Sequence, residues 1–409
     1  GAAHSDQFSR PLPSTAGIFV VPPTRLLALD AYRGFIMLAM ASAGLGIPKV
    51  AQHFPDCAVM RHLSWGLSHV TWVGCSPWDL IMPAFLFMVG VALPYSLARR
   101  REQGEPYART LGHGIWRALI LVALGVFLTC QAKRQFAVTF TNTLAQIGLA
   151  YPFAVLLTGR TPRVQIAVAA GIFALSWCLF VAHPVPPADF DYAAVAVPAK
   201  EVGEVTLPGL FAPWNKNANV ATAFDAWFLN LFPQQPGPFV AHPGGYATLN
   251  FLPSIITMLL GVMAGEMLRG PRATREKLVR LVAAGAGLLL LGWSLGLFLC
   301  PVVKRLWTPT FALFSGGWVI LLLAAFFATT EILGWKRWAF PFVVVGMNSI
   351  AIYLMSQLLS GWIASSLKIY LGKDAFAGAW GPLYQHAATL AALWLACYWL
   401  YRKRIFLRI

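Results

Sequence analysis

The chain has 409 residues, of which 58% are hydrophobic and 11% are charged. Soluble domains carry about a quarter charged residues, so this composition excludes an ordinary soluble protein and indicates a membrane protein. The net charge of +16 would also suit a nucleic-acid-binding protein, but the lysines and arginines lie between apolar stretches and form no single basic patch. We therefore expect a lipid bilayer, and no nucleic acid, as the partner of this chain.

Residues 1–24 are polar and rich in proline, and they lack the apolar core and cleavage site of a signal peptide. We expect a flexible cytosolic tail here. From residue 25 onward, apolar stretches long enough to cross a hydrocarbon core of ~30 Å recur along the chain. They predict an all-α, polytopic membrane protein with about ten transmembrane helices. The predicted helices occupy residues 28–47, 77–97, 114–131, 141–158, 163–183, 251–268, 277–299, 309–329, 340–363 and 382–401.

The basic residues are divided unevenly between the two sets of loops. About two thirds of the 31 lysines and arginines lie in the tail, at the C-terminus and in every second loop, including 99–117 and 269–280. Because loops rich in basic residues stay in the cytosol, both termini are predicted to be cytosolic. The loops at 48–76, 132–140, 184–250, 300–308 and 364–381 are then predicted to face outward.

The longest outward segment, 184–250, is rich in proline and aromatic residues, which suits an ordered loop over the membrane helices. Such loops often form the mouth of a binding site. Cys57 and Cys75 share another outward loop, where a disulfide and a pair of free thiols are both open interpretations. The sequence contains no CxxC motif and no Cys/His cluster, so we expect no metal.

Ionisable side chains near membrane depth are costly, so those beside the predicted helices are candidates for function. Asp30 and Arg33 have the spacing of an ion pair on one helix face, and a structural pair is the commoner interpretation. His69 and Asp79 stand ten residues apart at the outer start of the second predicted helix. A histidine can accept a proton at neutral pH, and a carboxylate can hold its tautomer. Two further histidines share this loop, so composition alone does not choose among the three.

Two later segments carry polar side chains that could contact a ligand. Asn348 lies inside the ninth predicted helix, where it could bind a ligand carbonyl or pack against another helix. Lys304, Arg305 and Trp307 form a basic and aromatic edge on an outward loop. Such an edge suits an acidic sugar, and it is also typical of an interfacial anchor.

Three separated motifs resemble the heparan-α-glucosaminide N-acetyltransferase family. They are RLLALDAYRG at 25–34, the stretch from His69 through Trp72, Gly74 and Asp79 to PAFLFMVG at 83–90, and LWTP at 306–309. Weaker likeness at 116–117, 259–265 and 346–349 extends the resemblance over nearly the whole membrane domain. The resemblance implies a transmembrane acyltransferase domain at 25–409. Such an enzyme takes acetyl-CoA from the cytosolic side and acetylates the amine of a terminal glucosamine on the other side.

The chain departs from the family pattern at Gly44, at 145–146 and in the HPGG stretch at 242–245. These departures bear on the identity of the acceptor and on the contacts with the acyl donor, and we expect an acetyltransferase that acts on bacterial glycans. The expected location is a bacterial inner membrane, with the acceptor side facing the periplasm.

The family's active-site histidine falls on His69, which the resemblance raises above the other two histidines of its loop. We expect His69 to act as general base, Asp79 to orient it, and Asn348 to donate to the thioester carbonyl. Direct transfer and an acetyl-histidine intermediate both fit this assignment.

The resemblance also implies a CoA site on the cytosolic side and an acceptor site on the outer side. The candidates for the CoA phosphates are Arg33, Arg117 and Arg337, and those for the acceptor are Lys304 and Trp307. The alternatives are an O-acyltransferase of cell-envelope polysaccharide or lipid headgroups and a transporter without covalent chemistry. A homodimer is a further expectation.

Overall fold

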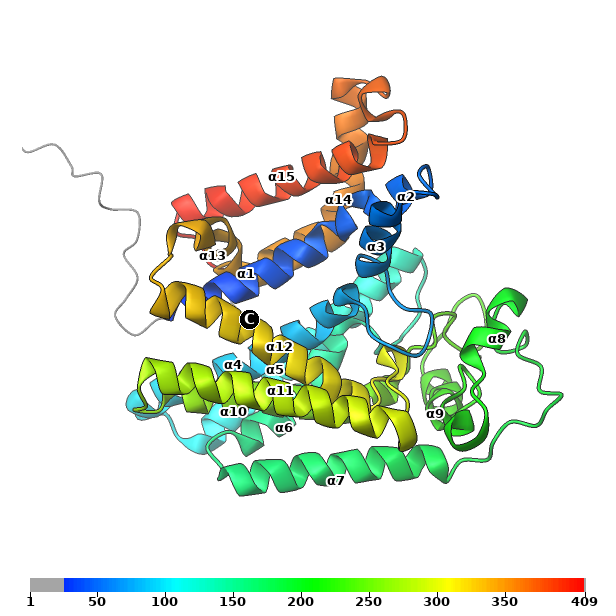
Figure 1. Ribbon diagram of the computed structural model, residues 1–409, viewed down its shortest axis with the longest axis horizontal. Coiled ribbons are helices and arrows are strands. Elements are labelled where there is room, and N and C mark those ends of the chain that lie inside the picture. The colour runs from blue at the N-terminus through cyan, green and yellow to red at the C-terminus, as the bar shows by residue number, and fades with distance from the viewer. Residues whose placement is uncertain (1–25, 408–409) are drawn as a thin grey trace, which may run out of the picture.

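A computed structural model describes residues 26–407 of the chain (Figure 1), so the tail predicted at 1–24 lies outside it. The described part contains fifteen α-helices and isolated β-bridges, but no β-strand. The all-α prediction is confirmed. The helices are α1 (Leu27–Ala41), α2 (Ile47–Ala51), α3 (Ala58–Gly66), α4 (Ile81–Glu102), α5 (Tyr107–Lys133), α6 (Thr143–Leu157), α7 (Pro162–Val181), α8 (Val202–Val205), α9 (Val220–Phe228), α10 (Phe251–Arg269), α11 (Thr274–Phe298), α12 (Pro309–Phe327), α13 (Phe340–Gly346), α14 (Ser349–Leu371) and α15 (Gly381–Arg402).

Seven helical segments of the described chain are long and apolar enough to cross a membrane. They are Pro77–Glu102, Tyr107–Lys133, Pro162–Val181, Thr248–Arg269, Thr274–Phe298, Pro309–Ile332 and Ser349–Leu371. The pair Leu27–Ala41 and Ala43–Ala51, which is bent by 40°, makes an eighth if it forms one span. The chain is thus a polytopic membrane protein, with fewer spans by this criterion than the ten or so predicted.

Three of the ten predicted helices account for the difference in number. The helix predicted at 28–47 is the bent pair, the one at 141–158 is short, and the one at 382–401, observed as α15, is long enough but does not reach the apolar criterion. Helix α6 has 15 residues, which gives a length of about 22 Å, less than the ~30 Å hydrocarbon core. The single helix predicted at 340–363 is two helices, α13 and α14, because Asn348 leaves the helical conformation with φ −127° and ψ 42°. This break changes the bounds of the helix and not the number of spans, because α14 is itself a candidate span.

Glycines allow the central helices to approach one another closely. Helix α10 packs along α4, with Gly261 against the backbone of Phe87 and Gly90 against the backbone of Met258. A Cβ atom at either glycine would overlap the carbonyl oxygen of the facing residue. Membrane helices gain stability from such close packing, because lipid supplies no hydrophobic force between them.

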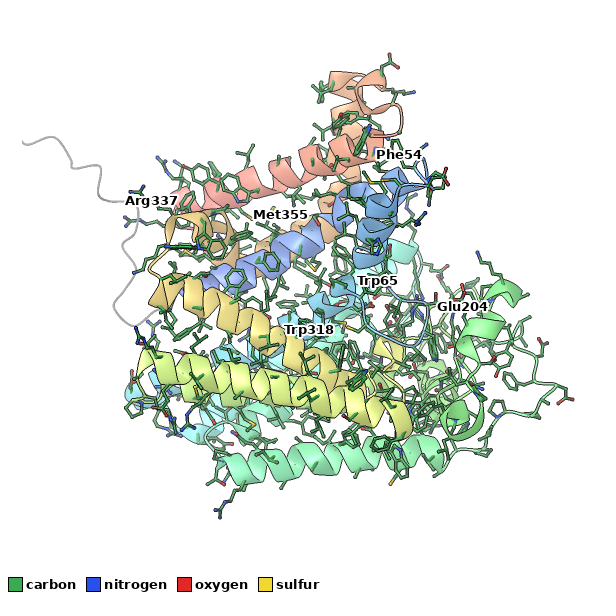
Figure 2. All side chains as sticks on the ribbon, in the orientation of Figure 1. Phe54, Trp65, Glu204, Trp318, Arg337 and Met355 are labelled. Carbon is green, nitrogen blue, oxygen red and sulfur yellow. The ribbon has the colours of Figure 1, made fainter. Side chains whose placement is uncertain are left out.

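The long helices run roughly side by side, with α8 and α9 beyond one end and α13 at the opposite end (Figure 1). Figure 2 marks these two ends with Glu204 and Arg337. The segments 48–76 and 184–250, which the charge distribution predicts to share one side, lie toward the same end. The assignment of this end to the outside stays a prediction.

A second apolar cluster joins the segment 184–250 to the ends of the membrane helices. Phe180 stacks on Trp214 with ring centroids 5.9 Å apart, and the Trp72 indole Nε1 donates to the Trp214 carbonyl at 3.0 Å. The segment is therefore packed onto the bundle and fixes the loop that begins at His69. All six cysteines are free thiols, so the disulfide considered between Cys57 and Cys75 is not formed.

Candidate active site

The short sequence before α4 positions Asp79. Ser76 and Pro77 begin a 3₁₀ turn at Pro77–Leu80, and the Ser76 hydroxyl accepts a hydrogen bond from the Asp79 backbone N–H at 3.3 Å. In return, the Asp79 carboxylate accepts from the Ser76 backbone N–H at 3.0 Å. This reciprocal capping box holds the carboxylate against the loop.

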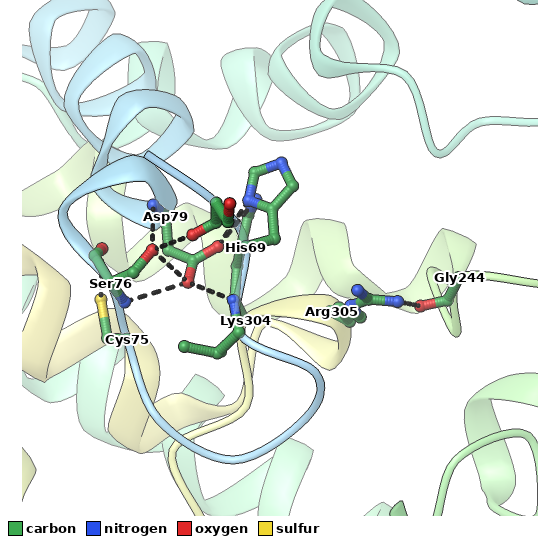
Figure 3. Close-up of polar contacts among 9 residues, drawn as sticks. His69, Cys75, Ser76, Asp79, Gly244, Lys304 and Arg305 are labelled. Atoms are coloured by element: carbon green, nitrogen blue, oxygen red, sulfur yellow. Dashed lines mark hydrogen bonds and ion pairs between the residues drawn. The ribbon is translucent and has the colours of Figure 1, made fainter. Parts of the chain in front are cut away.

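The two oxygens of the Asp79 carboxylate face different groups (Figure 3). Oδ2 accepts from the backbone N–H groups of Ser76 and Val70, the latter at 3.3 Å. Oδ1 lies 2.7 Å from His69 Nδ1 and 3.2 Å from Lys304 Nζ. Asp79 is completely buried, whereas 41% of the His69 side chain is exposed. The carboxylate therefore lies behind the imidazole ring, and the ring faces the protein surface.

Lys304 reaches this pair from a distant part of the chain. The backbone N–H of Gly74 donates to the Val302 carbonyl at 2.8 Å, which joins the loop after His69 to the loop before α12. Lys304 follows in the 3₁₀ turn Lys304–Leu306, and its Nζ lies 2.9 Å from His69 Nδ1. The site thus consists of an imidazole, a carboxylate and an ammonium group that share one small volume.

The hydrogen bonds of His69 determine what it can do chemically. All of its ring contacts within the described chain are made at Nδ1, with Asp79 and Lys304. When Nδ1 carries the proton and donates it to Asp79, the lone pair of a neutral imidazole is at Nε2. An exposed Nε2 lone pair, held by a buried carboxylate, is the arrangement of a general base.

Two other titratable groups near the site have shifted pKa values. Burial and then the charge of Asp79 raise the pKa of the Cys75 thiol to about 12, although Lys304 lowers it. Cys75 therefore stays a protonated thiol, which is a poor nucleophile. Burial lowers the pKa of His242 to about 4, and Lys133, Arg305 and Lys216 add to this effect.

Two of the three residues in the predicted outer basic and aromatic edge are buried. Lys304 is ion-paired with Asp79, and Trp307 is 1% exposed, with its Nε1 donating to the Thr257 hydroxyl at 3.2 Å. Arg305 alone keeps partial exposure, and its guanidinium donates to the Gly244 carbonyl at 2.9 Å. The structure thus places Lys304 and Trp307 inside the fold, because their loop packs onto the His69 cluster, and their contact with the acceptor stays a prediction.

Asn348 is separated from the cluster by its own hydrogen bonds. Its Nδ2 donates to the Ile405 carbonyl at 3.0 Å, and its Oδ1 accepts from the Leu407 backbone N–H at 3.1 Å. Asn348 is fully buried, and both ends of its amide bind the segment that follows α15. This geometry favours the packing interpretation of Asn348 over a contact with the thioester.

The three arginines considered for CoA lie on different elements. Arg33 forms the predicted pair with Asp30 on α1, at 3.9 Å. Arg117 on α5 lies over the Tyr151 ring, 4.9 Å from its centroid, and donates to its hydroxyl at 3.1 Å. Arg337 is exposed, at the end of the bundle opposite Glu204 (Figure 2).

Sequence reasoning missed two features of the site. The Ser-Pro-x-Asp pattern at 76–79 is a helix-start signature that could have been recognised. The contact of Lys304 with His69 spans 235 positions, and no local pattern announces it. Within residues 26–407, no group of three or more His, Cys, Asp or Glu side chains lies together in a way that could hold a metal ion.

The fold and the site define a polytopic membrane protein with a histidine, carboxylate and lysine cluster at one end of its helices. No family model matches the chain. It is similar to the heparan-alpha-glucosaminide N-acetyltransferase of Homo sapiens, with 25% identity over 434 residues, 97% of this chain and 62% of that protein. It is also similar to the protein of the same name from Mus musculus, with 23% identity, 94% of this chain and 60% of that protein. The chain is thus a relative of these N-acetyltransferases, as its motifs suggest, and it spans about three fifths of their length.

Proposed function

We propose that this protein transfers an acetyl group from acetyl-CoA to the amine of a terminal glucosamine-type sugar on the opposite side of a membrane. The observation that carries the proposal is the His69–Asp79 pair, whose hydrogen bond of 2.7 Å leaves the outward-facing Nε2 as the basic atom. The N-acetyltransferase names of the two relatives support the same reaction class. The departures from the family motifs make bacterial glycans in the periplasm the proposed acceptors.

The thioester is already activated, so the protein has to position two substrates and move protons. His69 Nε2 would remove a proton from the attacking amine as its nitrogen forms a bond to the acetyl carbon. The C–S bond then breaks, and the CoA thiolate leaves and takes up a proton. The tetrahedral oxyanion formed on the way needs nearby hydrogen-bond donors.

The donor would approach from the end of the bundle opposite His69. Arg337 is exposed at that end, and Arg33 and Arg117 are the other proposed partners of the CoA phosphates. Their own contacts, with Asp30 and with Tyr151, would have to open or be shared. The pantetheine arm would then extend into the bundle and carry the acetyl group toward His69.

The proposal is tested with purified protein in liposomes, supplied with acetyl-CoA and glucosamine, by mass spectrometry of the acceptor. His69→Ala should lower turnover by about 10²–10⁴-fold, the usual contribution of a general base, and leave acetyl-CoA affinity within a few-fold. His62→Ala is the control, because the exposed His62 ring makes a hydrogen bond with the Ala58 carbonyl and is not part of the His69 cluster.

The products and the variants separate the alternatives. Acetylation of a hydroxyl group in place of the amine would favour the O-acyltransferase, and binding without thioester consumption would favour the transporter. A protein that gains the mass of one acetyl group at His69 before acceptor is added would indicate an acetyl-histidine intermediate. Turnover that survives His69→Ala within threefold would refute the assignment of the base.

A further inference from the structure

Lys304 occupies an unusual position for a lysine. Its side chain is 6% exposed, and its Nζ lies 2.9 Å from His69 Nδ1 and 3.2 Å from Asp79 Oδ1. The same Oδ1 lies 2.7 Å from Nδ1. The three atoms therefore form a closed triangle (Figure 3), and the few protons within it can be placed by elimination.

An ammonium group has no lone pair, so a charged Lys304 can only donate. If it donated to His69 Nδ1, that nitrogen would carry no proton, and its lone pair would face Asp79 Oδ1 across 2.7 Å. The arrangement without this repulsion has Nδ1–H and the Lys304 ammonium both donating to the Asp79 carboxylate. Nε2 then carries the lone pair of the imidazole.

We propose that Lys304 is a positioning residue that acts on His69 through Asp79, keeping the imidazole neutral with its basic Nε2 facing outward. Asp79 alone would favour the imidazolium form, because an adjacent negative charge stabilises a positive one. The ammonium offsets that charge, and the hydrogen bond that orients the ring remains. This inference rests on the proposed role of His69 as general base.

The remaining groups around the triangle do not supply this effect. Cys75 stays protonated, as described above, and the Tyr246 ring lies 5.9 Å from Lys304 Nζ. Arg305 lies at the same distance over the Tyr246 ring and is held by the Gly244 carbonyl. Lys304 is therefore the cation in direct contact with the pair, and its burial leaves it little surface for the acceptor.

The test measures how readily His69 reacts with diethyl pyrocarbonate at different pH values, because this reagent modifies neutral imidazole at an accessible nitrogen. Peptide mass spectrometry reads His69 separately from the other histidines. In Lys304→Met and in Lys304→Gln, the midpoint of labelling should move up by about one pH unit or more, because the offsetting charge is lost. Lys304→Arg should restore the midpoint to within a few tenths of a unit, and Lys200→Met, a change at an exposed lysine of the segment 184–250, should leave it in place. Unchanged midpoints in both neutral variants, or an equal shift in Lys200→Met, would overturn the proposal.

Turnover measured on the same variants separates this inference from the proposed function. In the neutral variants, kcat at neutral pH should fall by up to about tenfold and recover at higher pH, with KM within a few-fold. Damage to the fold would not recover with pH. A shifted labelling midpoint in a protein without acetyl transfer would refute the general-base function, and the effect of Lys304 on the protonation of His69 would stand.

Discussion

Replacing Asp225 by asparagine should stabilise the protein, and the gain should grow as the pH rises. Asp225 on α9 is 1% exposed, and its Oδ2 accepts from the Thr248 backbone N–H at 2.9 Å. Its Oδ1 is buried without a hydrogen-bond partner among the described residues. Burial raises the pKa of Asp225 from 3.8 to about 6, although hydrogen bonds from Thr248 lower it.

The sign of the pH dependence follows from this raised pKa. Between about pH 4 and pH 6 the folded protein binds more protons than the unfolded chain, so stability falls as the pH rises through this window. For a pKa that is roughly two units higher in the folded protein, ionisation of Asp225 lowers the free energy of unfolding by about 3 kcal/mol at pH 8 and by about 1 kcal/mol near pH 4.5. Asparagine cannot ionise, and its carbonyl can still accept from Thr248. The free energy of unfolding of Asp225→Asn should therefore exceed that of the parent by about 1 kcal/mol near pH 4.5 and by about 3 kcal/mol at pH 8.

The measurement is unfolding in detergent by tryptophan fluorescence at several pH values between those limits. Asp189→Asn removes an exposed carboxylate from the same segment, 184–250, and should leave stability unchanged. The reasoning would be refuted if the difference in free energy of unfolding between Asp225→Asn and the parent did not increase with pH. So would a loss of stability at pH 8, because it would mean that the ionised Asp225 has a stabilising partner.

Two further predictions concern the bundle and its orientation. Gly261→Ala should destabilise the protein by about 1–3 kcal/mol, because the added methyl group overlaps the Phe87 backbone, whereas Gly287→Ala on α11 has open space and should be neutral in the same unfolding assay. In a variant without native cysteines, a thiol reagent that does not cross membranes should label Ala188→Cys and not Gln103→Cys in intact cells, because 99–117 is rich in arginine and is predicted to be cytosolic. The opposite labelling would place His69 in the cytosol and remove the need for transfer across the membrane.

The helical class and most helix positions could be predicted from the sequence, because a membrane helix satisfies its own backbone hydrogen bonds and needs only a sufficient run of apolar residues. The bounds of the individual helices were harder to predict. Whether Asn348 continues a helix or interrupts it depends on the segment at 405–407, whose backbone takes up both ends of the Asn348 amide. The pairing of His69 with Asp79 was within reach of sequence reasoning, because one loop carries both residues and a Ser-Pro-x-Asp turn fixes their approach.

Only the tertiary structure decided the surroundings of that pair. In the sequence, Lys304 and Trp307 look like parts of one basic and aromatic edge on an outward loop. The contact between Gly74 and Val302 turns their loop inward, so that Lys304 pairs with Asp79 and Trp307 enters the core. A side chain's exposure depends on which distant segment covers it, and residues 235 positions apart carry no local signal of their contact. The sequence alone therefore identifies His69 as a candidate general base. The lysine that we propose to control its charge is identified only in the folded chain.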